Sequence, residues 1–163
     1  NVTGILDVSG TVTIGSGAGK LDVGTVDPVY TIGGKQYATY MAGMVGVKEE
    51  TTGVFTMTDY SDDDDSYNYT VDFDDLEIGS DLWLFAKATN LVDNFDELTV
   101  ILTPSFNGNI WYNKDIGENE LIIYGSSEGE VSYRLTAPRF DSDEWSNYAD
   151  GSNEGFNLDR LLR

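Results

Sequence analysis

The side chains with the clearest chemical potential are carboxylates, which crowd into one short stretch of the sequence. Asp59 is followed by four consecutive aspartates at 62–65 and by three more between residues 72 and 75. Carboxylates at this density repel one another unless water or a cation screens them, and Ca²⁺ takes six to eight oxygen ligands. The spacing is not that of an EF-hand, because Phe73 stands where the last glutamate of such a loop belongs. A calcium site and a solvated acidic loop are both open interpretations.

Two further acidic stretches extend the same hypothesis, one within residues 90–97 and one at 141–144. Calcium is the cofactor that this chemistry would use, bound within one chain or between the carboxylates of two chains. The candidate ligands are Asp59, Asp62, Asp63, Asp64, Asp65, Asp93, Asp96, Asp141 and Asp143.

Most catalytic chemistry is excluded by composition. The chain has no His and no Cys, so it lacks the base of a serine–histidine triad and any thiol nucleophile. Paired carboxylates could serve a glycosidase, but among 29 acidic residues some pair always lies at a suitable distance. Residues 15–20, GSGAGK, are not a phosphate-binding loop, because Leu21 follows the lysine. We therefore predict that the protein is not an enzyme.

The net charge of −20 opposes binding to phosphate backbones, so we expect no nucleic-acid partner. No apolar run approaches the length that spans a bilayer, so we expect no membrane span. The chain begins at Asn1 rather than Met, as a processed, exported protein would. Two N-x-[ST] sequons make Asn1 and Asn68 candidate glycosylation sites. These features favour a secreted protein that is extracellular or attached to the cell surface.

Aromatic residues form a second candidate surface. Trp145, Tyr148 and Trp111 could stack on the faces of sugar rings, as in carbohydrate-binding β-sandwich modules. The other interpretation is that Trp111 is a core residue, because it lies within an expected strand. Trp145 lies in an acidic loop, and we expect it to be the most exposed of the three.

The elements that must position these residues follow a period of two. Along residues 1–14, apolar or small side chains alternate with polar ones, which predicts a long strand with one buried face. A glycine-rich hinge at 15–19 follows this strand. The residues of its apolar face are Val2, Gly4, Leu6, Val8, Gly10, Val12 and Ile14.

Short alternating segments separated by Gly, Asp, Asn and Pro continue to residue 137. They predict an all-β protein, a jelly-roll or Ig-like β-sandwich of about nine to ten strands. We expect residues 1–19 to form the N-terminal strand and hinge, and residues 20–163 to form a sandwich domain with acidic loops and a C-terminal tail. The expected strands are 20–26, 36–48, 53–58, 67–73, 81–89, 97–103, 109–113, 120–124 and 130–137.

The N-terminal strand has two possible partners. It could pair within its own sheet as an ordinary first strand, or it could complete the sheet of a neighbouring copy. In the second case, main-chain hydrogen bonds supply affinity and alternate side chains fill pockets. Gly4 and Gly10 on the apolar face would allow close approach of another backbone.

Two segments carry a resemblance to known families. Residues 6–14, LDVSGTVTI, resemble the start of mature TasA- and camelysin-like matrix fibre proteins and of archaeal bundling-pilus subunits. Residues 75–80, DLEIGS, followed by 82–90, resemble a motif that recurs in those proteins, with Ile78 at its proline position. The acidic composition is similar to that of cannula subunits, which assemble with calcium. The resemblance implies jelly-roll subunits that insert an N-terminal strand into the next copy, and no protease activity, because the chain lacks His.

The function that the sequence predicts is therefore a structural subunit of an extracellular filament, pilus or tube. Its partners would be copies of itself, joined by residues 1–14, with calcium at the acidic loops. The alternative is a secreted, calcium-dependent carbohydrate-binding module that takes glycans as partners. An acidic surface adapted to high salt is a third interpretation.

Overall fold

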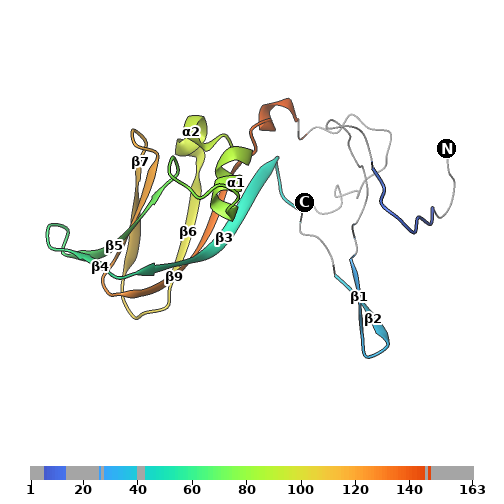
Figure 1. Ribbon diagram of the computed structural model, residues 1–163, viewed down its shortest axis with the longest axis horizontal. Coiled ribbons are helices and arrows are strands. Elements are labelled where there is room, and N and C mark those ends of the chain that lie inside the picture. The colour runs from blue at the N-terminus through green and yellow to red at the C-terminus, as the bar shows by residue number, and fades with distance from the viewer. Residues whose placement is uncertain (1–5, 14–25, 27, 40–42, 146, 148–163) are drawn as a thin grey trace, which may run out of the picture. The chain divides into compact units, whose positions relative to one another are not determined.

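The computed structural model describes residues 6–13, 26, 28–39, 43–145 and 147 (Figure 1). The chain divides into two compact units, which we describe separately. One consists of Asn1–Gly43 with Asp150–Arg163, and the other of Met44–Ala149. The boundary expected between residues 19 and 20 lies outside the described residues.

The first unit contains a β-hairpin of β1 (Val29–Ile32) and β2 (Lys35–Ala38). Gly33 and Gly34 form its turn with φ angles of 58° and 76°, which two successive glycines adopt without strain. Thr39 closes the open end by donating from both its backbone N–H and its hydroxyl to the carbonyl of Pro28. The strand expected over 36–48 is therefore wrong in extent, because bends over 45–47 separate β2 from the next strand.

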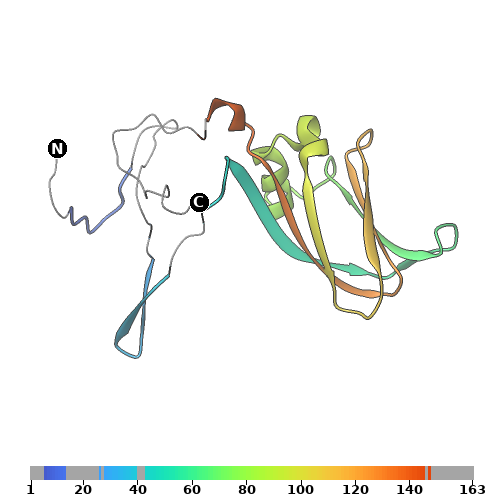
Figure 2. The same cartoon turned by 180° about the vertical axis from the view of Figure 1, so that it is seen from behind.

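The described residues of the second unit form seven antiparallel strands in two sheets (Figure 2). One sheet has the order β3-β9-β6 and the other the order β4-β5-β8-β7. The strands are β3 (Lys48–Met57), β4 (Asp59–Ser61), β5 (Ser66–Asp72), β6 (Thr99–Pro104), β7 (Ile110–Asp115), β8 (Glu120–Gly125) and β9 (Gly129–Pro138).

This strand order follows the A-B-E-D and C-F arrangement of an Ig-type sandwich, with β3 in the place beside β9 that a seventh strand G occupies. β3 continues almost directly into β4, so one stretch of chain passes from the three-stranded sheet to the four-stranded sheet at Thr58. The all-β prediction is confirmed. The segments expected over 67–73, 97–103, 109–113, 120–124 and 130–137 are β5 to β9, and the one expected over 53–58 is the second half of β3.

The core lies between the two sheets and follows the alternation of the strands. Val131, Tyr133, Leu135 and Ala137 of β9 are all buried and face inward, with polar residues between them. Leu121 and Ile123 of β8 contribute to the core from the four-stranded sheet on the other side. Phe55 of β3 stacks between Tyr69 and Tyr133, with ring centroids 4.6 and 4.2 Å apart.

Residues 81–89, expected as a strand, form instead the helix α1 (Asp81–Ala88), so that prediction is wrong. The Ser80 hydroxyl caps the helix by accepting from the backbone N–H of Trp83 at 3.2 Å. Asp81 in the first turn and Lys87 in the last complement the helix dipole. Alternating Leu and Ala mimicked a strand here, but both residue types favour helices.

Shorter helices complete the second unit: α2 (Leu91–Asn94) and the 3₁₀ turns η1 (Phe95–Glu97) and η2 (Ser142–Glu144). Leu91 and Phe95 are buried, so α2 and η1 close the core beside α1. The buried Thr89 ends α1, with its hydroxyl donating to the carbonyl of Phe85 at 2.8 Å.

Candidate functional site

The N-terminal segment is described from residue 6 to residue 13, and these residues form no strand. A bend at Ser9 and Gly10 interrupts them. The apolar side chains expected to be buried lie in solvent, with Leu6 69%, Val8 45% and Val12 56% exposed. Val2, Gly4 and Ile14 of the same expected face lie outside the described residues, as do residues 20–25 of the strand expected over 20–26. Within the part of the chain that is described, the segment has the pattern of a strand without a paired neighbour.

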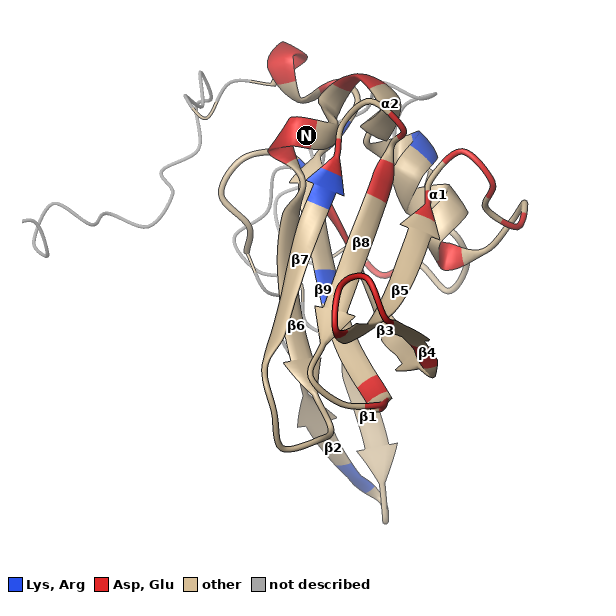
Figure 3. Ribbon diagram, turned by 90° about the vertical axis from the view of Figure 1, so that its left-hand side faces the viewer, with Lys and Arg blue, Asp and Glu red and all other residues tan. Residues whose placement is uncertain are grey.

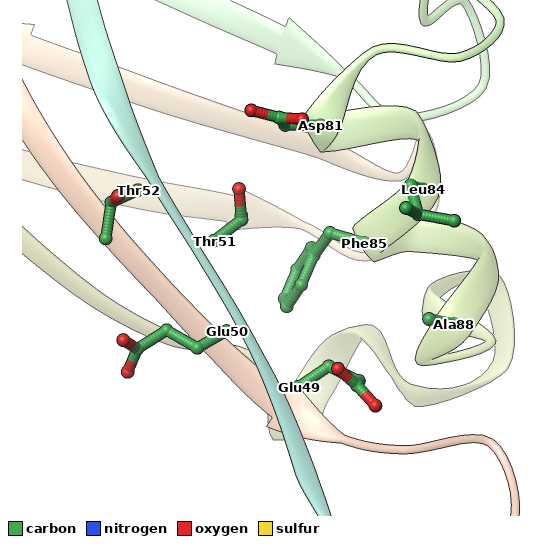
Figure 4. A pocket seen from close by; sticks show the side chains of 8 residues that line it. All are labelled: Glu49, Glu50, Thr51, Thr52, Asp81, Leu84, Phe85 and Ala88. Carbon is green, nitrogen blue, oxygen red and sulfur yellow. The ribbon is translucent and has the colours of Figure 1, made fainter. Parts of the chain in front are cut away.

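A groove of about 300 Å³ lies between β3 and α1 (Figure 4). Phe85 reaches from α1 toward β3, while Glu50 and Thr52 point to the other side of the strand. Leu84, at the rim, is 60% exposed. The residues that line the groove are Glu49, Glu50, Thr51, Thr52, Asp81, Leu84, Phe85 and Ala88.

The groove runs along a strand at the edge of its sheet. Among the described residues, β3 pairs only with β9, over ten consecutive register positions. Its other edge therefore presents unpaired backbone N–H and C=O groups, which can template the addition of a further strand. The groove combines these backbone groups with apolar surface from Leu84 and Ala88, while Phe85 behind them is buried in the core.

Acidic side chains surround this apolar surface. Glu50 accepts a hydrogen bond from Arg134 Nε at 2.6 Å, which ties its carboxylate to β9. Glu49 and Asp81 lie on the helix side of β3. Burial raises the pKa of the Tyr133 hydroxyl, and the negative charge of Asp81 raises it further. The groove therefore disfavours anionic ligands and suits an apolar or cationic segment.

The aspartates at 62–65 form the turn between β4 and β5, where acidic residues gather in Figure 3. Asp64 accepts a hydrogen bond from the Ser61 hydroxyl at 2.9 Å, and Asp65 accepts one from the Tyr60 hydroxyl. That bond raises the pKa of Tyr60, because it stabilises the neutral phenol. Asp59, on β4, lies opposite Asn68 in the register. The hydrogen bonds of Ser61 and Tyr60 to these aspartates therefore stabilise the turn.

The remaining candidate ligands are spread over other loops. Asp93 accepts a hydrogen bond from the Asn90 amide at 2.8 Å, and Asp96 is exposed in η1. Asp143 is exposed in η2. Within the described residues, no group of three or more acidic side chains is arranged to hold a metal ion. The structure therefore brings none of the nine aspartates into a preformed calcium site within one chain.

Asp141 already has partners. Arg139 donates to it from Nε and from Nη2, and Trp145 Nε1 donates at 2.9 Å. These bonds to Arg139 and Trp145 lower the pKa of the Asp141 carboxyl. Arg139 also lies 5.9 Å from the Trp145 ring centroid, in a cation–π contact. Trp145 is therefore held and partly buried, and the expectation that it is more exposed than Trp111 is wrong.

Trp111 lies on the outer face of the four-stranded sheet and is 45% exposed. Its indole stacks on Tyr124, with ring centroids 5.8 Å apart and planes 10° from parallel. The interpretation of Trp111 as a core residue is therefore wrong. Of the other candidates, Tyr148 and Asn1 lie outside the described residues, whereas Asn68 is half-buried on the same outer face as Trp111.

Sequence reasoning missed the groove because it assigned residues 81–89 to a strand. A signal was present: Ser80 followed by Asp81, with Lys87 near the end, has the order of a capped helix. It also missed Tyr124, which becomes a partner of Trp111 only through the pairing of β7 with β8.

No protein-family model matches the chain, and neither a curated protein nor a solved structure does. None of the helices in the described residues has the length and apolar character needed to cross a membrane.

Proposed function

We propose that the protein is a non-enzymatic structural subunit that polymerises outside the cell by donating residues 1–14 to a neighbouring copy. The observation that carries this proposal is the exposure of Leu6, Val8 and Val12 in a segment with the alternation of a strand. An apolar face of this kind is stabilised when a partner covers it.

The edge of β3 is the acceptor that suits this segment best. A donated strand would hydrogen-bond to the free backbone edge of β3, and one row of its side chains would contact Leu84 and Ala88. Asp7 is the only charged residue in the segment 1–14, so little charge is carried into the acidic groove.

Calcium would assist polymerisation by reducing the repulsion between subunits. Subunits of net charge −20 repel one another, and screening of Glu49 and Asp81 or of the turn at 62–65 would reduce this repulsion. Such an ion would take carboxylates from two copies. If EDTA changes neither the assembly nor the melting temperature, calcium has no structural part.

Deletion of residues 1–14 tests the donor. Negative-stain micrographs of the full chain, with and without calcium, should show filaments or tubes, and the truncated chain should remain a monomer. Two double variants test the donor without shortening the chain. Val8→Asp with Val12→Asp, on the apolar face, should abolish polymers. Thr11→Asp with Thr13→Asp, on the polar face, adds the same charge and should weaken polymers less. Filaments of normal morphology after the deletion would contradict the proposal.

A secreted carbohydrate-binding module is the second candidate, favoured by the exposed Trp111 on a sheet face. This function requires quenching or enhancement of tryptophan fluorescence when glycans are titrated into the monomer, with and without calcium. A flat titration across glycan classes would argue against it.

A further inference from the structure

The outer face of the four-stranded sheet places a glycosylation sequon beside the stacked pair of Trp111, which is exposed, and Tyr124, which is half-buried. In the register, Asn68 of β5 lies opposite Tyr124 of β8, and Tyr124 lies opposite Trp111 of β7. These three side chains form one row across the sheet, because directly opposite residues share a face. Asn68 and Trp111 are two strand spacings apart, roughly 10 Å.

Both polar residues of the sequon share this face. Asn68 and Thr70 are two positions apart in β5, so their side chains point to the same side of the sheet. Thr70 is exposed and Asn68 is partly exposed, whereas Val71 points into the core. The hydroxyl and the amide of the sequon are therefore both on the solvent side.

On β5, β8 and β7 the immediate neighbours of the aromatic pair are neutral, whereas Asp59 of β4 lies opposite Asn68, on the side away from Tyr124. The next row consists of Thr70, Ile122 and Asn113, all neutral. Figure 3 shows this face uncoloured over most of β5, β8 and β7, in a protein with 29 acidic residues. A neutral, polar ligand with flat apolar faces suits a surface of aromatic rings and amides, and sugar rings have this chemistry.

We propose that Asn68 carries an N-linked glycan whose first sugars pack against Tyr124 and Trp111. In the attachment step, Asn68 Nδ2 attacks the anomeric carbon of a lipid-phosphate-linked oligosaccharide. The new C–N bond forms as the C–O bond to the lipid phosphate breaks; the lipid phosphate leaves and the amide proton passes to a base. This proposal is independent of strand donation.

The glycan would shield the exposed part of Trp111 and Tyr124 from contact with other copies. Trp111 and Tyr124 would otherwise form an apolar patch at a sheet face, where unspecific association begins.

Peptide mass spectrometry of the full chain, produced in a host with an N-glycosylation pathway, tests the attachment. The peptide containing Asn68 should carry a glycan mass, and Thr70→Ala should remove it. Absence of a glycan from Asn68, in cells that modify a control sequon on another secreted protein, would overturn the proposal.

Melting temperatures of the glycosylated and unglycosylated forms of the wild type and two variants test whether the glycan packs against Trp111. We expect the glycan to raise the melting temperature of the wild type by roughly 2–4 °C. This increment should disappear in Trp111→Ala and persist in Tyr112→Ala, which removes an exposed aromatic from the other face of the same strand. Equal increments in all three proteins would overturn the packing.

A second measurement does not depend on the folding of a variant. In the glycosylated wild type, protons of the first sugar should show upfield ring-current shifts in NMR spectra, relative to the released glycopeptide. Identical shifts in the folded protein and the glycopeptide would contradict the contact with Trp111 and Tyr124.

Discussion

Strand β9 and residues 6–13 have the same alternation of apolar and polar side chains but the opposite burial. Val131 and Leu135 of β9 are fully buried, because β3 and β6 flank the strand and the second sheet covers its apolar face. Leu6 and Val12 have the same chemical character and remain exposed. A period of two therefore identifies a segment able to form a strand, while burial depends on whether a partner is present.

The largest effect is expected from Leu135→Ala in β9. Removing buried methyl groups from the core should lower the free energy of unfolding by about 2–5 kcal/mol. Val12→Ala, the control in the N-terminal segment, should change it by less than about 0.5 kcal/mol in the monomer. Denaturant unfolding measures both, and equal losses would show that the N-terminal segment packs within its own chain.

Gly53→Ala tests whether the edge strand β3 is packed as tightly as β9. A Cβ at Gly53 would overlap the ring of Tyr133, which stacks on Phe55. The substitution should cost about 1–3 kcal/mol in thermal or denaturant unfolding. Gly117→Ala, where the added atom meets only Asp115 Oδ1 at 3.5 Å, is the matched control. A neutral result at Gly53 would mean that β3 adjusts easily.

Ser80→Ala loosens the helix that forms one wall of the groove. Loss of the cap on α1 should lower the free energy of unfolding by about 1 kcal/mol. Ser132→Ala, exposed on β9, should have almost no effect. Hydrogen exchange in residues 83–85 provides the local readout, and unchanged exchange there would show that the cap is unimportant.

The smallest effect is expected at Asp141, near the end of the described sandwich. Because its pKa is lowered in the folded chain, ionised Asp141 contributes stability above its ordinary pKa of 3.8, and this is lost as the pH falls through the lowered value. Asp141→Asn should therefore lower the melting temperature slightly at neutral pH, with the difference vanishing in strong acid. Asp143→Asn is the control, and a difference that persists in strong acid would exclude the carboxylate as its cause.

Much of the sandwich could be predicted because its strands alternate and end at turn residues, as β5 to β9 do. Prediction failed at α1, where Leu and Ala fit both periods and the cap at Ser80 decided the outcome. The candidate site depends on pairing between distant segments. Neither feature has a local signature: the groove requires the packing of α1 beside β3, and the contact of Trp111 with Tyr124 requires the register of β7 with β8.

The pairing of β3 with β9 has a consequence for the synthesis of the chain. Arg134 of β9 and Glu50 of β3, which are hydrogen-bonded diagonally across this pair, are 84 residues apart. At the pace of translation, β3 leaves the ribosome roughly 4–17 s before β9. During that delay both edges of β3 are open to other nascent chains. Glu49 and Glu50 then act as gatekeepers against premature aggregation, because like charges oppose the pairing of one β3 with another.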